Sequence, residues 1–362
     1  MAVLFLTGFP GFLGSTLLPG LLANRPVDRA VCLVQPRWAP LATQAAGRLA
    51  LTAPHTRGRL ELVEGDIVEP GLAMSPGSWQ AQVTDVFHFA AAYDLGVPRG
   101  IAERVNVAGT RHVLDYCARF PQLRAVHYVS TCFVSGRYDG VFRESDLDVG
   151  QVFNNFYEES KALAEREVVR ARAGGLPVVV YRPSVVVGDS RTGETQKYDG
   201  PYAVLHLLLR QGRTALLPVP GLPERTTLNV VPSDFVARAM VWLSGRPESL
   251  GRTYHLADPA PYTVDRILTL MGNATGKRRV LRVPVPYQVA RRMLDQSRWL
   301  RRQLGVTPQL LDYFMHPTQY DTANASRDLA PGRIVAPRFD DYLHKLVEFM
   351  KGHPGIGVSG MQ

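Results

Sequence analysis

Short apolar runs alternate with longer amphipathic stretches through the first half of the chain. Apolar runs bounded by glycine, proline and polar residues are typical of buried strands, and apolar residues spaced by three or four positions are typical of helices. The pattern predicts strands at 2–6, 30–34, 60–63, 83–89, 126–130 and 178–182, and helices at 15–23, from 99 to 120 and at 156–173. Strands that alternate with helices in this way favour an α/β fold with a doubly wound parallel sheet.

After Pro183 the alternation loosens. Residues 188–200 are polar and rich in glycine, as in a loop that faces a ligand, whereas 229–243 resembles a strand leading into a helix and 253–256 a further strand. We expect residues 1–187 to form the sheet domain, with 228–256 returning to it. Residues 188–362 then form mainly a smaller C-terminal lobe.

The first strand is followed by a glycine-rich turn, TGFPGFLG, in which Gly8, Gly11 and Gly14 are spaced by three residues. Glycine at such positions permits a tight turn and lets backbone N–H groups approach a pyrophosphate at a helix N-terminus. An export signal would need a basic segment before the apolar run and no helix-breaking residues within it, and neither condition is met. The sequence therefore predicts a Rossmann-type dinucleotide-binding domain, with a cofactor held by Thr7, Gly8, Gly11, Phe12, Leu13 and Gly14.

Composition narrows the class of protein. The 362 residues are 46% hydrophobic and 20% charged, which is enough apolar material for a sizeable core. Three cysteines without paired spacing favour a reducing compartment, so we expect a cytoplasmic protein. No apolar run reaches the roughly 18 residues of a spanning helix, and the nine histidines lack metal-ligand spacing, so no metal is expected.

Positive charge is concentrated in the predicted lobe. Residues 277–302 contain nine basic residues and one acid, a net charge of +8, and 289–304 has the pattern of a basic amphipathic helix. Three interpretations stay open: a solvated helix face, peripheral contact of 277–304 with an anionic membrane, or contact with the phosphates of coenzyme A or an acidic carrier protein. No nucleic-acid-binding motif accompanies the charge, so nucleic acid is not an expected partner.

The chemical signal of the chain is Tyr157-Glu158-Glu159-Ser160-Lys161 on the predicted helix 156–173. Positions i and i+4 share a helix face, so the phenol and the ammonium point into one cleft. A nearby cation lowers the pKa of a phenol and prepares it for acid–base catalysis, and the same lysine can bind a ribose hydroxyl. A hydroxyl partner is expected from Ser130 or Thr131, of which strand alternation lets only one face the cofactor.

Three other reactive side chains have simpler explanations. His88 ends an apolar strand and is expected to be a core imidazole with its hydrogen bonds satisfied. His206 is expected to pack within a helix of the lobe, and Cys132 to pack against a strand.

Together these motifs resemble the extended short-chain dehydrogenase/reductase superfamily, which includes NAD-dependent epimerases and dehydratases. Within it the chain is most similar to the branch of fatty acyl-CoA reductases and terminal thioester-reductase domains. The resemblance covers nearly the whole chain and rests on TGFPGFLG (7–14), GDI (65–67), FHFAAAYD (87–94), NVAGT (106–110), YVSTCFVSG (128–136), YEESK (157–161), YRPSVVVGDSRTG (181–193), NVVPSDFVA (229–237) and YHLADP (254–259).

The resemblance implies a catalytic triad of Thr131, Tyr157 and Lys161, with Asn106 supporting the helix and the lysine. It also assigns cofactor contacts: Asp66 and Ile67 to the adenine, Ala90 and Ala91 to the wall at the fourth strand, Pro183 and Ser184 to the nicotinamide side. The branch usually has an arginine directly after the second strand for the 2′-phosphate of NADP. Here Gln35 stands there and Arg37 follows, with no acidic residue for NAD, so NADP is expected and NAD stays open.

The implied function is an NAD(P)H-dependent reductase of a lipid-like acyl thioester, bound to coenzyme A or a carrier protein, or of a related carbonyl. Two enzymatic alternatives are a sugar-nucleotide epimerase or dehydratase and a hydroxysteroid-type dehydrogenase. A third alternative is a regulator that senses dinucleotide without catalysis. The sequence carries no signal for the oligomeric state.

Overall fold

A seven-stranded parallel sheet forms the centre of the computed structural model, which describes residues 2–297, 299, 301 and 308–357. The strand order is β3-β2-β1-β4-β5-β7-β11, so it reverses between β1 and β4, where doubly wound folds open a crevice for ligands. The strands are β1 (Val3–Thr7), β2 (Arg29–Val34), β3 (Leu60–Glu64), β4 (Val83–His88), β5 (Ala125–Val129), β7 (Val178–Pro183) and β11 (Thr253–Leu256).

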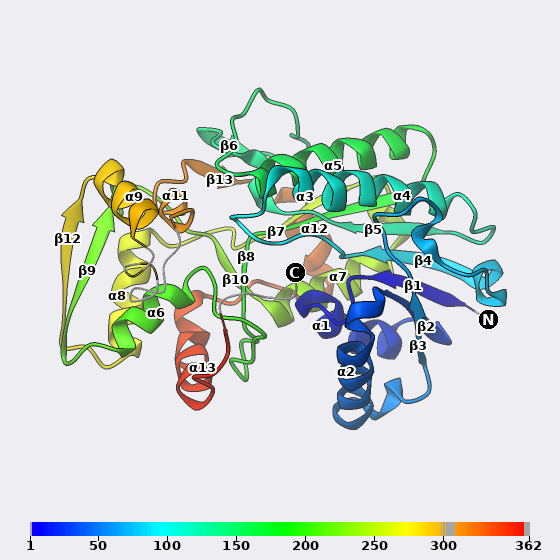
Figure 1. Ribbon diagram of the computed structural model, residues 1–362, viewed down its shortest axis with the longest axis horizontal. Coiled ribbons are helices and arrows are strands. Elements are labelled where there is room, and N and C mark those ends of the chain that lie inside the picture. Colours follow the sequence, from blue (N-terminus) through cyan, green and yellow to red (C-terminus); the bar gives the residue numbers. More distant parts are fainter. Residues whose placement is uncertain (1, 298, 300, 302–307, 358–362) are drawn as a thin grey trace.

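Helices cover both faces of this sheet (Figure 1). Strand side chains alternate, so Val3 and Phe5 pack on one face while Leu4 and Leu6 pack on the other. The first face is covered by α4 (Gly109–Cys117) and α5 (Phe156–Ala173), with α3 (Arg99–Ala102) packed against α5. The second face is covered by α1 (Phe12–Asn24), α2 (Ala39–Thr52), α7 (Ser233–Ser244) and α12 (Ala323–Leu329). The predicted Rossmann-type α/β fold is confirmed.

The strands expected from apolar runs agree with the structure to within a residue or two, and α5 has the predicted bounds. Three expectations were wrong in detail. Helix α1 begins at Phe12 because Gly11 is its N-cap, and the helix expected over 99–120 is interrupted by a π-helical turn, η5 (Glu103–Ala108). The strand expected before α7 is β10 (Val230–Pro232), which pairs with β8 (Val185–Val187) instead of joining the main sheet.

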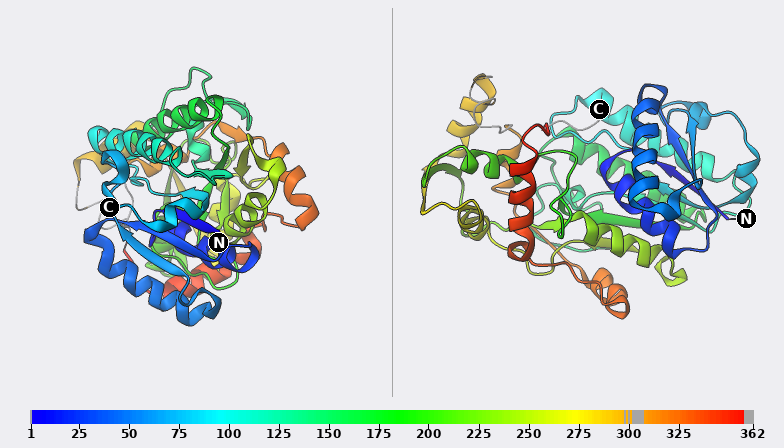
Figure 2. Two further views of the ribbon diagram at one scale, coloured as in Figure 1. Left: turned by 90° about the vertical axis from the view of Figure 1, so that its right-hand side faces the viewer. Right: turned by 90° about the horizontal axis from the view of Figure 1, so that it is seen from below.

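The lobe lies at the end of the molecule opposite β2 and β3 (Figures 1 and 2). Its centre is a parallel pair, β9 (Thr214–Pro220) and β12 (Arg279–Val285), packed on α6 (Tyr202–Leu209), α8 (Val264–Ala274) and α13 (Phe339–Gly352). Helices α9 (Tyr287–Gln296) and α11 (Leu310–Tyr313) follow β12, and β13 (Thr318–Tyr320) pairs with β6 (Gly140–Phe142). The domain boundary near residue 187 stays a prediction.

Helix α9 replaces the longer amphipathic helix expected over 289–304, part of which lies outside the described residues. Within the described ranges, no helix has both the length and the apolar character needed to cross a bilayer.

Candidate active site

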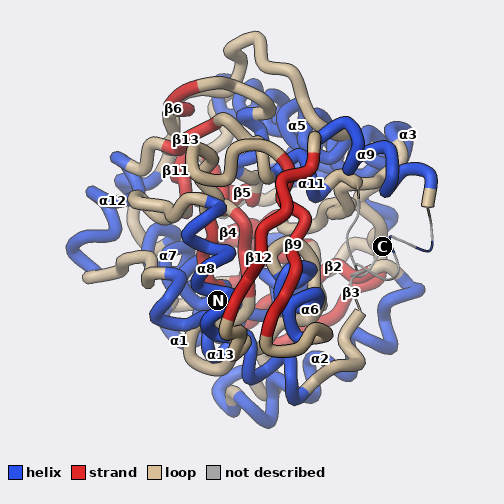
Figure 3. The backbone as a smooth tube through the Cα atoms, turned by 90° about the vertical axis from the view of Figure 1, so that its left-hand side faces the viewer, coloured by secondary structure: helices blue, strands red, loops and turns tan. Residues whose placement is uncertain are grey.

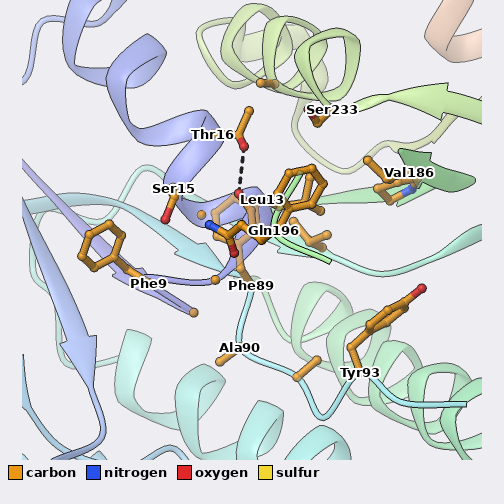
Figure 4. A pocket seen from close by; sticks show the side chains of 18 of the residues that line it. Phe9, Leu13, Ser15, Thr16, Phe89, Ala90, Tyr93, Val186, Gln196 and Ser233 are labelled. Atoms are coloured by element: carbon orange, nitrogen blue, oxygen red, sulfur yellow. Dashed lines mark hydrogen bonds between the residues drawn. The ribbon is translucent and has the colours of Figure 1, made fainter. Parts of the chain in front are cut away.

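A large cleft of about 2980 Å³ opens at the carboxyl ends of β1, β4 and β5. Among the segments that line it are three distant in sequence: the glycine loop with α1, the loop after β4, and the segment from β8 through the polar loop 188–200. Figure 4 shows their contributions, with Leu13 and Thr16 from the first, Ala90 and Tyr93 from the second, and Val186 and Gln196 from the third.

The glycine loop has a geometry that only glycine permits. Gly8 has a φ of +88°, and a Cβ there would lie 2.7 Å from the backbone nitrogen of Ala90. A Cβ on Gly14 would lie 2.8 Å from the carbonyl oxygen of Gly8. Gly11 caps α1 without a side-chain hydrogen bond, so the first-turn N–H groups are left for an anion. All six residues assigned to this loop line the cleft: Thr7, Gly8, Gly11, Phe12, Leu13 and Gly14.

The residues expected near the adenine and its ribose also line the cleft. The Gln35 amide donates to Asp66 over 2.9 Å, and the Arg37 guanidinium donates to the Gln35 side-chain oxygen over 2.9 Å. Ile67 lies beside them. Arg48 lines the same cleft from α2, a helix that the sequence pattern did not reveal.

At the opposite end, Pro183 and Ser184 line the cleft with Ala90 and Ala91. The Ser184 hydroxyl is buried and has no hydrogen-bond partner among the described residues. Buried hydroxyls are nearly always paired, so an orphaned one in a cleft fits a ligand with polar groups, such as a nicotinamide carboxamide. The glycine loop at one end of the cleft and the buried Ser184 hydroxyl at the other end together fit a dinucleotide.

Helix α5 presents Tyr157 and Lys161 to the cleft. Asn155 is the N-cap of this helix, and its side-chain oxygen accepts a hydrogen bond from the backbone N–H of Glu158. Burial raises the pKa of the Tyr157 phenol above its ordinary value, and a hydrogen bond with Thr131 opposes part of this rise. Burial also lowers the pKa of Lys161 from 10.5 to about 7. The expectation that the ammonium lowers the pKa of the phenol was therefore wrong for this state, because desolvation dominates both groups.

Strand alternation gave a second wrong expectation, because both Ser130 and Thr131 line the cleft. Strand β5 ends at Val129, and Thr131 is the N-cap of a 3₁₀ turn, η6 (Cys132–Ser135), accepting from the backbone of Phe133 over 3.2 Å. The strand therefore ends before Ser130 and Thr131, so the alternation of side chains along a strand does not apply to these two residues.

Asn106 lies outside the cleft lining, in the π-helical turn η5. Its amide donates to the Ser160 hydroxyl over 2.9 Å, and its side-chain oxygen accepts from the backbone of Ala92 over 2.7 Å. Asn106 therefore links α5, the helix that carries Lys161, to the loop after β4. Its expected support of the lysine stays a prediction.

Sequence reasoning missed an aromatic and charged cluster beside Tyr157. The Tyr93 ring stands edge-on to the Tyr157 ring with centroids 5.0 Å apart. The Lys197 ammonium lies 3.7 Å from the Tyr93 ring centroid and pairs with Asp199 over 2.6 Å. The sequence contains one signal for this cluster: Lys197 is one of only five lysines in the chain, and it lies in the polar loop 188–200.

The simpler explanations for other reactive groups agree with the structure. His88 is buried between the hydroxyls of Thr7 (2.7 Å) and Thr110 (3.0 Å), and burial lowers its pKa to about 3. The Cys132 thiol is buried and donates to the carbonyl of Arg182, and His206 lies in α6. The described residues contain no group of three or more side chains suited to hold a metal ion.

The parallel sheet and the glycine loop at its carboxyl edge define a Rossmann-type fold of the extended short-chain dehydrogenase/reductase superfamily. The chain belongs to the family described as male sterility protein, whose model matches residues 6–240.

Two curated relatives and one solved structure illustrate the similarity. A linear gramicidin synthase from Brevibacillus parabrevis is 29% identical over 284 residues, which cover 74% of this chain. Aldehyde reductase lnbA of Aspergillus flavus is 27% identical over 297 residues, which cover 76% of this chain. The chain spans only 5% and 28% of the lengths of these two relatives. The terminal R domain from the myxalamid PKS-NRPS biosynthetic pathway has a TM-score of 0.81 at 27% identity, covering 98% of this chain and 91% of that one.

UDP-glucuronic acid 4-epimerase from Bacillus cereus has a TM-score of 0.68 at 19% identity, covering 97% of each chain. This similarity shows a shared fold and carries no information about the reaction.

Proposed function

We propose that the protein uses NADPH to reduce a lipid-like acyl thioester, carried by a protein or by coenzyme A, to an aldehyde or onward to an alcohol. The observation that carries this proposal is the pair of hydroxyls of Tyr157 and Thr131, backed by Lys161, in the cleft that the glycine loop opens. Relatives named as an aldehyde reductase and as peptide synthetases support a reductive step on an acyl group.

A bound reduced nicotinamide supplies the hydride that adds to the thioester carbonyl carbon. As negative charge develops on the carbonyl oxygen, the Tyr157 and Thr131 hydroxyls hydrogen-bond it, and Tyr157 gives it a proton. The resulting hemithioacetal breaks its carbon–sulfur bond to release an aldehyde and a thiol. Lys161 stabilises the phenolate that Tyr157 becomes until solvent returns its proton. Exchange of the oxidised cofactor for a second NADPH would supply a second hydride for the aldehyde carbon, and Tyr157 would again protonate the oxygen to give an alcohol.

The test is NADPH oxidation measured over a panel of acyl-CoA, acyl-pantetheine, aldehyde, ketone and nucleotide-sugar substrates. The proposal predicts oxidation with the thioesters and with the matching aldehydes. Turnover of nucleotide sugars without net NADPH consumption would instead assign an epimerase or dehydratase, and binding of NADPH without turnover of any substrate would assign a regulator.

The cofactor preference has its own test at Arg37, whose guanidinium stands at the end of β2 where no acidic side chain would bind a ribose diol. Replacing Arg37 by alanine should raise the KM for NADPH by about 10-fold or more, since a charge-assisted contact to phosphate is lost. The KM for NADH should change less than about two-fold, because NADH lacks the phosphate. Arg57→Ala, at an exposed site outside the cleft, serves as the control.

The outer face of the lobe is the candidate site for the carrier. The β9–β12 register places Leu216 beside Leu281 and Pro218 beside Val283, on the side away from α8. These four residues are exposed, and Figure 3 views β9 and β12 from this end of the molecule. Exposed arginines stand at the start of the two strands, Arg213, Arg278 and Arg279. Further exposed basic and apolar side chains follow in and just after α9: Val289, Arg292, Met293 and Trp299. We infer that this surface, named the β9–β12 face, docks an acidic carrier domain.

Another segment of the lobe reaches the cleft. Gln309, just before α11, lies against Gly96 at the rim of the cleft, and Tyr313 of α11 donates to Glu158 over 2.8 Å. The lobe therefore contacts both the rim and the catalytic helix.

Reversing two charges of this face, Arg279→Glu with Arg292→Glu, should raise the KM for a carrier-bound thioester by about 10-fold or more at low salt. The same acyl group on free pantetheine should show an unchanged KM, and Arg57→Glu should change neither. A KM for the carrier-bound thioester that stays at the wild-type value in the double variant would remove the docking assignment. Salt-sensitive binding to anionic vesicles, with no carrier effect, would assign the face to a membrane surface.

A further inference from the structure

Beneath the cleft, a continuous series of buried hydrogen bonds connects Lys161 to the glycine loop. The Lys161 ammonium donates to the Tyr128 hydroxyl over 2.9 Å, and this hydroxyl also hydrogen-bonds Thr110. Thr110 is 3.0 Å from one ring nitrogen of His88, and the other ring nitrogen is 2.7 Å from the hydroxyl of Thr7. The five residues come from α5, β5, α4, β4 and β1, and none is more than 3% exposed.

One direction of donation satisfies every group in the series. A charged lysine has no lone pair, so Tyr128 accepts from it and has its own proton to donate to Thr110. Thr110 then donates to Nε2 of His88, which is neutral because burial lowers its pKa to about 3, and Nδ1 donates to Thr7. The Thr7 hydroxyl also accepts from the backbone of Ala90 over 3.3 Å, so the series ends in the loop that forms the cofactor site.

Lys161 is itself held in a defined geometry. Of its three N–H groups, one donates to Tyr128 and one to the carbonyl of Val129 over 2.8 Å, which leaves one for the cleft. The Lys161 nitrogen also lies 4.5 Å from the centroid of the Tyr128 ring.

We propose that Tyr128 is the positioning residue of this site: its hydroxyl orients the Lys161 ammonium toward the cleft and couples it, through Thr110 and His88, to Thr7 of the glycine loop. The inference rests on the proposed function only in taking Lys161 as the ammonium that serves Tyr157.

The charge on Lys161 depends on few groups. Glu165, one turn further along α5, favours the charged form, although it is itself paired with Arg182 over 2.6 Å. His88 on β4 is neutral, and Tyr157 on α5 is a phenol because burial raises its pKa. Among the described residues, the ammonium hydrogen-bonds two oxygen acceptors, the Tyr128 hydroxyl and the carbonyl of Val129.

The experiment measures the protonation of Lys161 directly in the cofactor-free protein. With lysine labelled at ¹³Cε, the five lysines give five resonances, and Lys161→Met assigns the one of interest. In the wild type this resonance should titrate near 7. In Tyr128→Phe its midpoint should fall by about one pKa unit or more, since an acceptor to a charged donor is lost. The dissociation constant for NADPH, measured by fluorescence, should rise several-fold with it.

Tyr181→Phe is the matched control, because it removes a buried phenol oxygen from the neighbouring strand, where Tyr181 hydrogen-bonds His127 and not Lys161. It should leave the Lys161 midpoint unchanged. Thr110→Val interrupts the series without touching the lysine and should shift the midpoint in the same direction by a smaller amount, which keeps the test valid if Tyr128→Phe folds poorly. An unchanged midpoint in folded Tyr128→Phe, or in Thr110→Val where Tyr128→Phe does not fold, overturns the proposal. The titration of Lys161 uses no substrate, so its result does not depend on whether the reductase assay succeeds.

Discussion

Replacing Tyr157 by phenylalanine should lower kcat for thioester reduction by about 10²- to 10⁴-fold, the usual contribution of a positioned general acid. The change removes only the hydroxyl that hydrogen-bonds Thr131. The ring keeps its packing with Val97, Ala102 and Tyr93, so the fold should be retained. The dissociation constant for NADPH, measured by fluorescence titration, should stay within about three-fold of the wild type, because the hydroxyl serves the substrate oxygen.

Tyr138→Phe provides a matched control, since Tyr138 packs near Phe142 outside the cleft lining. It should leave kcat and NADPH binding unchanged. A Tyr157→Phe enzyme that turns over as fast as the control would remove Tyr157 from the chemistry.

Replacing Gly8 by alanine should weaken NADPH binding by about 100-fold or more, comparable to losing two charge-assisted hydrogen bonds. A Cβ at this position meets the backbone of Phe89 and Ala90 at 2.7–2.8 Å, and the φ of +88° is unfavourable for alanine. The loop must therefore move, and the N–H groups that face the pyrophosphate move with it. Equilibrium dialysis or fluorescence titration measures the effect.

Gly47→Ala is the control for this substitution. Gly47 lies in α2 with no atom within 4 Å of a Cβ built there, so alanine should raise the free energy of unfolding by about 1 kcal/mol through helix propensity. NADPH binding should be unchanged. Gly8→Ala protein that binds NADPH as tightly as Gly47→Ala protein would contradict the assignment of the loop.

Much of the sheet domain was predictable because its signals are local. Strand β1, Val3–Thr7, is apolar from Val3 to Leu6 because both of its faces are buried, and such a run is visible in sequence. The glycine loop and the Tyr157–Lys161 spacing are equally local, because a turn and one helical turn set their geometry. These features placed the cleft at the correct end of the sheet.

The lobe was less predictable because its contacts are distant in sequence. Strand β12 pairs with β9 across more than fifty residues, and its apolar alternation is disguised by Arg282, which reaches Asp265 and Thr269 on α8. The proximity of Tyr93 and Lys197 beside Tyr157 likewise depends on how two loops meet. The spacing of residues within either loop does not indicate this contact between the loops.

The pKa values of the site were mispredicted for a related reason. The sequence shows that Tyr157 and Lys161 share a helix face, but it does not show how deeply that face is covered. Lys161 is 3% exposed and Tyr157 is 5% exposed, so desolvation is the largest influence on the pKa of each group. Their charge states therefore depend on the packing of the lobe and the sheet around them.

The most direct test of the proposed function is a single-turnover reaction of the wild-type protein with NADPH and an acyl-pantetheine thioester. NADPH absorbance and free thiol are followed in the same sample, and aldehyde and alcohol are identified by mass spectrometry. The account predicts that each thiol released is matched by one NADPH oxidised when aldehyde accumulates, and by two when alcohol does. Thiol release without NADPH oxidation, or NADPH oxidation that continues undiminished in Tyr157→Phe, would contradict it.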